Sequence, residues 1–203
     1  HFGNMPIDRL IVATNENDVL HEFFDKASYQ PRPSNKTYVT SSPSMDISKA
    51  SNFERFIYTL LNKDGEKVAE LFTKVKQGEG FKLDEKLDEI RQDYGFISGK
   101  STHQDRLNTI KKVYQDTGRL IDPHTADGVK VAKDVQNQDE IIVVAETALP
   151  IKFAETIKEA VGDIDLPRPK HTEGLETKPQ FVIVLDNDAK LVADEICRKV
   201  YAK

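Results

Sequence analysis

A short apolar run followed by a helical pattern opens the chain. Residues 9–13 read Arg-Leu-Ile-Val-Ala, a continuous run that is typical of a strand buried on both faces. The next five residues, 14–18, are polar and suit the start of a helix. Apolar residues then recur at helical spacing at Val19, Leu20, Phe23 and Phe24. A strand, a loop and a helix in this order predict one unit of a parallel α/β sheet.

Two later apolar runs predict further strands. The first lies at residues 140–145 and is followed by a helix at about residues 150–161. The second lies at residues 181–185, after a connector at residues 163–179 that is rich in Pro, Lys and Glu. Asp188 then caps a final helix. The predicted inward face of that helix carries Leu191, Val192, Ile196 and Val200.

Helical signals fill the middle of the chain, at residues 51–135. Capping boxes that open at Ser51 and at Ser101 predict two helix starts, because each serine oxygen could accept the backbone N–H three residues on. Asp122, followed by a proline at the first helical position, predicts another start. Residues 95–98 are the one weak strand candidate in this region.

These patterns predict an α/β fold in three parts. Residues 5–50 and 136–203 carry the sheet, and the second of these parts ends in a strand and a helix. Residues 51–135 form a large, all-helical insertion between them. Residues 1–4 stand apart, because no element fits between them and the strand at residues 9–13, and we interpret them as a scar of truncation.

The composition is that of an ordinary globular protein. Of 203 residues, 38% are hydrophobic and 31% are charged, which argues against a disordered chain. The net charge is −5, and no basic stripe is present, so nucleic acid is not an expected partner. The apolar runs are too short to cross a bilayer, and no signal-peptide pattern opens the chain.

Neither the cysteine nor the histidines predict a metal site. Cys197 is the only cysteine, and we expect it to be buried on the terminal helix of a protein in the reducing cytosol. Four histidines lie on different segments without ligand spacing: His21, His103, His124 and His171. The serines lack the Gly-x-Ser-x-Gly elbow of hydrolases. We therefore assign no metal ligand and no catalytic residue to this chain.

Polar residues follow two of the predicted strands. Thr147 lies just past the run at residues 140–145, and Thr14 lies just past residues 9–13. Ligands of open α/β sheets bind at the carboxyl ends of strands, and a threonine hydroxyl can hydrogen-bond a ring nitrogen without bringing a charge. Thr147 is therefore a candidate ligand-binding residue. Alternatively, it only caps the helix that follows Pro150.

Five motifs form one ordered set along the chain. They are PIDRLIVATNEND at residues 6–18, SPSMDI at 42–47, SNFER at 51–55, DPHTA at 122–126 and ETALPIKF at 146–153. In order and spacing they resemble the threonine synthase family, in its bacterial and fungal-type branch. The resemblance covers nearly everything from Met5 onward and corresponds to the C-terminal part of the family.

The resemblance implies a fold-type II pyridoxal-phosphate enzyme of the cytoplasm. Such an enzyme converts O-phosphohomoserine and water to L-threonine and phosphate, as a carbon–oxygen lyase of threonine biosynthesis. Pyridoxal 5'-phosphate is the electron sink, and the protein orients it. The resemblance places Thr147 beside the pyridine nitrogen of the cofactor, and residues 14–18 and 42–46 on the substrate side.

Two family motifs are missing or incomplete. The Schiff-base lysine of the family lies upstream in a Phe-Lys-Asp motif, which this chain lacks. The phosphate loop of the family reads Gly-Asn-Phe-Gly-Asp or Gly-Asn-Phe-Gly-Asn, and only Phe2-Gly3-Asn4 could be its remnant, unless those residues are a tag. The isolated chain is therefore predicted to be inactive.

Two alternatives remain open. One is a related pyridoxal-phosphate enzyme, such as a serine or threonine dehydratase or a tryptophan synthase β chain. The other is a non-catalytic binding module that uses the helices of residues 51–135 as a partner surface. The sequence does not indicate an oligomeric state.

Overall fold

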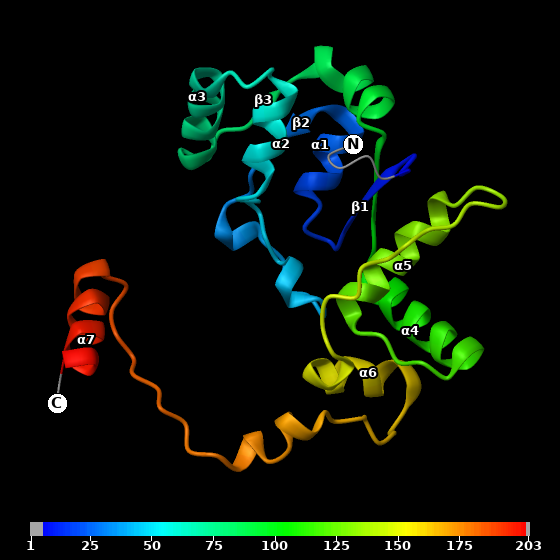
Figure 1. Cartoon of the computed structure of the whole chain (residues 1–203), viewed down its shortest axis with the longest axis vertical. Helices are drawn as coiled ribbons and strands as arrows, with labels where there is room; N and C mark the ends of the chain where they lie inside the picture. The colour runs from blue at the N-terminus through cyan, green and yellow to red at the C-terminus, as the bar shows by residue number, and fades with distance from the viewer. Residues whose placement is uncertain (1–5, 202–203) are drawn as a thin grey trace. The chain divides into compact units, whose positions relative to one another are not determined.

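The computed structural model describes residues 6–201 and has a mixed α/β fold (Figure 1). The chain divides into two compact units, one that ends at Pro167 and one that begins at Arg168. The interpretation of residues 1–4 as a scar or loop remnant falls outside the described residues. Within residues 6–201, every helix is too short or too polar to cross a lipid bilayer.

A parallel pair of strands forms the centre of the first unit. β1 (Leu10–Thr14) pairs with β4 (Phe96–Lys100), and the first residues of the two strands are opposite each other. The strand predicted at residues 9–13 is confirmed with a shift of one residue. The weak candidate at residues 95–98 becomes a complete strand, because β1 supplies the hydrogen-bonding partner that local sequence could not reveal.

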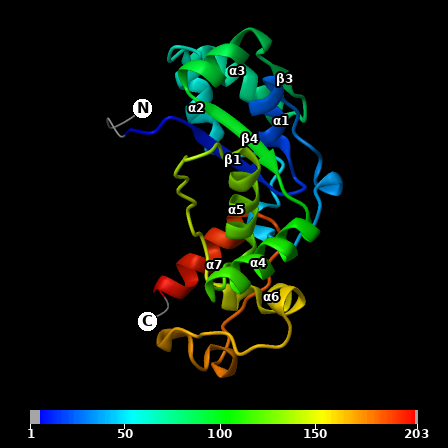
Figure 2. The ribbon, with the colours of Figure 1, turned by 90° about the vertical axis from the view of Figure 1, so that its right-hand side faces the viewer.

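Two helices contact both strands. α1 (Val19–Lys26) and α5 (Pro123–Val135) each pack against β1 and β4 (Figure 2). Gly99 permits the close approach of α5, because a Cβ atom at that position would lie 2.8 Å from Val131 Cγ1. The strand–loop–helix unit predicted at the start of the chain is confirmed.

An aromatic core lies on one side of this sheet. It joins α1 to α2 (Phe53–Leu60), α3 (Gly65–Lys76) and an antiparallel pair, β2 (Ser28–Tyr29) with β3 (Phe81–Lys82). Its buried rings include Phe23, Phe24, Tyr29, Phe53, Phe72 and Phe81. Because β3 and β4 both lie between residues 51 and 135, the prediction of an all-helical insertion is wrong in detail. The helices there are interleaved with strands that pair with the N-terminal part.

A second core joins α4 (His103–Thr117) to α5 and α6 (Ala154–Val161). Its buried residues are Ile110, Ile121, Ala126, Ile157, Ala160 and Leu166. The helix predicted at residues 150–161 is present, although its first turn, Pro150–Phe153, is a 3₁₀ helix. The other short turns of this unit are the 3₁₀ helices Ser34–Lys36, Pro43–Met45 and Asp84–Lys86 and the π-helical turn Glu89–Asp93.

Of the three helix caps predicted within residues 51–135, only the cap at Asp122 holds as written. The side chain of Asp122 accepts the His124 N–H, as predicted. At α4 the capping box is one residue later, at Thr102 and Asp105 rather than at Ser101. At α2 the N-cap residue is Asn52 and makes no side-chain cap, so the prediction for Ser51 is wrong.

The run at residues 140–145 is not a strand in this structure. Ile141 and Val143 are 92% and 89% exposed. A strand needs a neighbour for its backbone N–H and C=O groups, and within residues 6–201 no strand pairs with this segment. The apolar pattern is therefore present without the pairing that would complete it.

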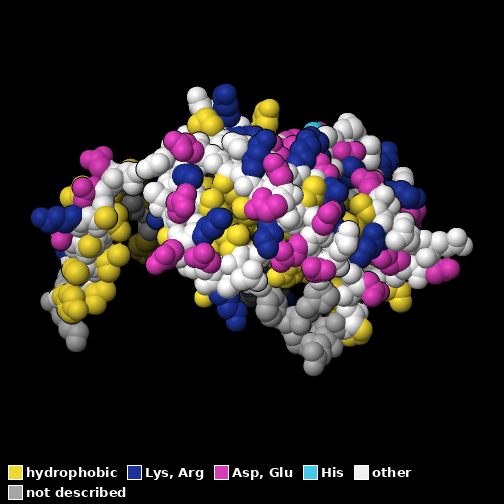
Figure 3. Space-filling view, turned by 90° about the horizontal axis from the view of Figure 1, so that it is seen from above, with side chains coloured by type: hydrophobic (Ala, Val, Ile, Leu, Met, Phe, Trp, Pro, Cys, Tyr) yellow, Lys and Arg dark blue, Asp and Glu magenta, His cyan; other side chains and the backbone are white. Residues whose placement is uncertain are grey.

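The second unit contains α7 (Ala189–Tyr201) and two 3₁₀ turns, Lys170–Thr172 and Leu175–Thr177. Asp188 Oδ1 accepts the N–H groups at the start of α7, so the predicted cap is confirmed. Three predictions fail here. Residues 181–185 form no strand, the apolar face of α7 is exposed rather than inward (Figure 3, at left), and Cys197 is exposed. Within the described part of this unit, residues 168–201, these apolar side chains stay exposed.

Candidate functional site

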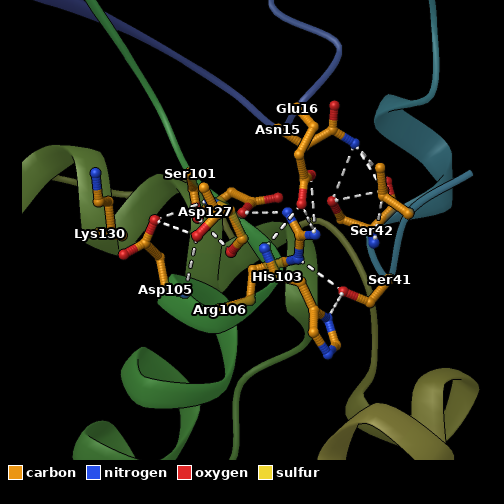
Figure 4. A network of polar contacts seen from close by, with 12 residues as sticks. Asn15, Glu16, Ser41, Ser42, Ser101, His103, Asp105, Arg106, Asp127 and Lys130 are labelled. Atoms are coloured by element: carbon orange, nitrogen blue, oxygen red, sulfur yellow. Dashed lines mark hydrogen bonds and ion pairs between the residues drawn. The ribbon is translucent and has the colours of Figure 1, made fainter. Parts of the chain in front are cut away.

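Four segments far apart in sequence meet at the carboxyl ends of β1 and β4 (Figure 4). Because the two strands are parallel, the chain leaves both of them at the same edge of the sheet, which is where α/β sheets bind ligands. We call this cluster of polar residues the strand-end site. Its segments are residues 14–18, 40–46, 101–106 and 122–127.

Asp46 is the centre of one half of the strand-end site. Its Oδ1 accepts from Asn15 Nδ2 at 2.8 Å and from Asn17 Nδ2 at 3.0 Å. It also accepts from the Thr40 hydroxyl at 2.7 Å, while Oδ2 accepts from the Thr40 N–H at 2.8 Å. The two amide side chains are buried. The loop after β1 is therefore fastened to residues 40–46 by hydrogen bonds to a carboxylate, which are the stronger kind.

Arg106 is the centre of the other half. Its side chain is fully buried, and Nη2 donates to both carboxylate oxygens of Glu16, at 2.9 and 3.0 Å. Nη1 donates to Asp127 Oδ1 at 3.1 Å, and Nε donates to Ser41 Oγ at 2.8 Å. Ser41 Oγ lies 2.8 Å from His103 Nδ1. Figure 4 shows Glu16, Ser41 and Asp127 around the guanidinium group of Arg106, each from a different segment.

Asp127 carries an unusual carboxyl group. It is fully buried, and its Oδ2 atom has no hydrogen-bond partner among the described residues. Burial raises the pKa of this carboxyl above its ordinary value, although the nearby Ser101 hydroxyl and the charge of Arg106 act in the opposite direction. The protonated acid is thus easier to form at this position than at an exposed aspartate.

His124 joins three of the five motifs. Its Nε2 accepts the Ser44 N–H at 3.0 Å, so the ring proton lies on Nδ1, which donates to Asp122 Oδ1 at 2.7 Å. The other oxygen of Asp122 accepts from the Thr125 hydroxyl. The ring of His124 packs edge-on against Phe153, with 4.8 Å between the ring centroids. Motifs that the sequence could only place in order are therefore in contact in space.

Two cavities adjoin the strand-end site. One, of about 210 Å³, is largely apolar and is lined by Ala13, Thr14, Asn17, Val19, Leu20, Met45, Ile47 and Ala50. The other, of about 400 Å³, lies between residues 40–43 and the start of α6. Both cavities therefore border segments that the sequence placed near a ligand.

The two candidate threonines lie in different surroundings. Thr14 is buried in the strand-end site, and its hydroxyl donates to Gly99 O at 3.4 Å. Thr147 is exposed and makes no hydrogen bond with any described residue. It does not cap the helix that follows, because the N-cap residue there is Leu149. The capping alternative for Thr147 is therefore wrong, whereas its role as a ligand contact stays a prediction.

Sequence reasoning missed Arg106. Arginine is almost never fully buried unless it is paired, so nothing in the local sequence singled out this position. One signal was available: Arg106 and the core residue Ile110 are four positions apart and therefore share one face of α4. No group of three or more His, Cys, Asp or Glu side chains arranged for a metal ion occurs within the described residues.

Comparisons with known proteins agree on one family. A family model described as threonine synthase, C-terminal, matches residues 125–196. The threonine synthases of Corynebacterium glutamicum and Methylobacillus glycogenes are 52% and 49% identical to this chain, over 95% and 97% of its length. The crystal structure of PLP-bound threonine synthase from Brucella melitensis is 36% identical and superimposes with a TM-score of 0.82 over 95% of this chain.

The fold and the position of the site define an α/β protein of the fold-type II pyridoxal-phosphate class. The chain belongs to the threonine synthase family and matches its C-terminal part. It spans 40% of the length of the Corynebacterium enzyme and 40% of the Brucella enzyme.

Proposed function

We propose that the whole protein containing this chain is a pyridoxal-phosphate-dependent carbon–oxygen lyase, which converts O-phosphohomoserine and water to L-threonine and phosphate. One observation carries the proposal: three of the five motifs that resemble threonine synthases, at residues 6–18, 42–47 and 122–126, contribute segments that meet at the strand-end site. Their agreement in sequence is thus matched by contact in space. As an enzyme of amino-acid biosynthesis, the protein would act in the cytoplasm.

The residues of this chain fit pyridoxal 5'-phosphate at one position. Thr147 presents an exposed hydroxyl that makes no hydrogen bond with any described residue. That hydroxyl could hydrogen-bond the pyridine nitrogen of the cofactor without forcing it to be protonated, as a carboxylate would. The cofactor, when bound, supplies an electron sink. The contribution of this chain is to orient the ring and to present residues 14–18 and 42–46 to the substrate.

We further propose that the 203-residue chain is inactive alone. Covalent catalysis through an imine needs an amine held at the cofactor aldehyde, and no lysine here lies in the Phe-Lys-Asp motif of the family. The exposed apolar segments at residues 140–145 and 181–185 support this proposal. Such segments suit strands that complete a sheet with other parts of the protein.

The test uses the full-length protein. Purified protein with pyridoxal phosphate is incubated with O-phosphohomoserine, and released phosphate and threonine are measured. Matched incubations replace the substrate with L-serine or L-threonine and measure 2-keto acids, and the 203-residue chain is assayed in parallel. Stoichiometric phosphate and threonine from the full-length protein alone support the proposal. Keto acid without phosphate indicates a dehydratase, and no product in any incubation favours the non-catalytic module.

A further inference from the structure

Arg106 donates hydrogen bonds in three directions from a fully buried position. Its partners belong to three other segments: Glu16 follows β1, Ser41 precedes the Pro43–Met45 turn, and Asp127 lies on α5. Arg106 itself lies in the first turn of α4. One planar, always-charged group thus ties together every segment of the strand-end site, which a lysine could not do with the same geometry.

The link through Glu16 is double. Glu16 Oε1 accepts from Arg106 Nη2 and also from the His103 N–H at 2.8 Å. The His103 N–H is at the start of α4 and has no acceptor within the helix. The link through Ser41 is also extended, since Ser41 Oγ contacts His103 and His103 Nε2 lies 3.0 Å from Glu159 on α6. Each of the two loops is therefore bonded to both His103 and Arg106 of α4.

A buried ion cluster of this kind is a weak source of stability, because desolvation of the charges offsets their attraction. It does fix geometry, since each bond has a narrow range of distances and angles. The two loops that it holds carry the Asn15, Asn17 and Asp46 side chains of the other half of the site. The position of those loops, rather than stability, is the property that such a cluster can supply.

We propose that Arg106 is a positioning residue, which holds residues 14–18 and 40–46 in their ligand-binding arrangement before any ligand arrives. It acts through Glu16 and Ser41 and touches no reacting group. The proposal rests on the proposed function for its catalytic consequence, but not for its structural one. The two consequences are therefore tested separately.

The structural consequence is tested by amide hydrogen exchange on the 203-residue chain. Arg106→Gln should raise exchange in both loops and at the His103 N–H by about tenfold, since bonds to a charged group are lost, with α3 amides unchanged. Arg106→Lys keeps the positive charge but lacks the planar guanidinium group, so its exchange rates should lie between those of wild type and Arg106→Gln. The matched control is Arg91→Gln, whose side chain is 46% exposed and donates to Asp25 O, and it should change neither loop.

Ser41→Ala keeps the proposal testable if Arg106→Gln does not fold. It removes one link and leaves the Arg106–Glu16 bonds in place, so faster exchange should be confined to residues 40–46. Unchanged exchange in both loops of Arg106→Gln, or a uniform rise that includes α3, overturns the proposal. So does a rise in residues 14–18 of Ser41→Ala that equals the rise in residues 40–46.

The catalytic consequence is tested in the full-length protein by phosphate release from O-phosphohomoserine. A displacement of about 1 Å can lower the rate by about 100-fold, so kcat/KM should fall by 10- to 100-fold in Arg106→Gln. The kcat/KM of Arg106→Lys should lie between those of Arg106→Gln and wild type, and the kcat/KM of Arg91→Gln should equal that of wild type. The absorbance of the bound cofactor should stay unchanged, because the proposed role of Arg106 runs through Glu16 and Ser41. Wild-type protein that releases no phosphate refutes the proposed function, and the exchange result alone then decides the role of Arg106. An active wild type with an equally active Arg106→Gln variant overturns the positioning role.

Discussion

Replacing Arg106 with methionine measures the energy of the buried charge cluster. Methionine is similar in length and has no charge, so Asp127 is left in the interior without its ion-pair partner. Asp127 is fully buried, whereas the Glu16 side chain is 26% exposed and can be hydrated. Removal of one partner of a buried pair costs about 3–5 kcal/mol. With a urea m-value of about 2 kcal/mol/M, the unfolding midpoint should fall by about 2 M.

The second variant of this cycle identifies the cause. Arg106→Met combined with Asp127→Leu removes both charges, and replacement of a buried pair by apolar residues is often neutral or stabilising. We expect the double variant to lie within about 1 kcal/mol of wild type. Urea unfolding of the four chains at pH 7, followed by circular dichroism and tyrosine fluorescence, gives the coupling energy. A coupling energy near zero, or a single Arg106→Met variant as stable as wild type, would refute the reasoning.

Three further predictions address single side chains. Because burial raises the pKa of Asp127, folding favours its protonated form, so the stability it contributes is present below about pH 4 and is lost as the pH rises through the raised pKa. Relative to Asp127→Asn, the wild-type free energy of unfolding should therefore decrease between pH 4 and pH 7 in urea titrations, and parallel curves would contradict this. Phe53→Ala should cost about 3–5 kcal/mol in thermal or urea unfolding, since its ring lies 4.6 Å from Phe23 and 4.8 Å from Tyr29 between centroids; a loss below about 1 kcal/mol would contradict the packing. Thr147→Val in the full-length enzyme should shift the visible absorbance of the cofactor and lower turnover, with recovery in Thr147→Ser, and an unchanged spectrum and rate would remove Thr147 from the site.

The contrast between two apolar runs shows what the sequence can predict about this fold. Residues 9–13 and 140–145 have the same pattern, and both predict strands. Only the first is paired, because β4 lies beside it. Hydrophobic patterning records which segments are built for a sheet, whereas pairing depends on a partner that is distant in the sequence. The same reason explains why α7 is amphipathic in sequence and exposed in this structure.

Local sequence preferences predict part of the strand-end site. The cap at Asp122 and the buried strand end at Thr14 follow from neighbours in sequence and are present. The hydrogen bonds from Asn15 and Asn17 to Asp46 and from Arg106 to Glu16 join residues 29 to 90 positions apart, and no local preference predicts them. A charged side chain is expected at the surface unless it is paired, so the shared helix face of Arg106 and Ile110 does not by itself predict that Arg106 is buried. Sequence therefore located the strand ends but not the network between them.

The double variant also separates stability from positioning. With Arg106→Met and Asp127→Leu together, the unpaired buried charge is gone, so the free energy of unfolding should recover. The bonds to Glu16 and Ser41 are still missing, so residues 14–18 and 40–46 should continue to exchange their amides faster than in wild type. In the full-length protein, phosphate release should likewise stay low despite normal stability. If exchange and activity recovered together with stability, the loops would be held by packing alone, and the guanidinium group would have no separate role.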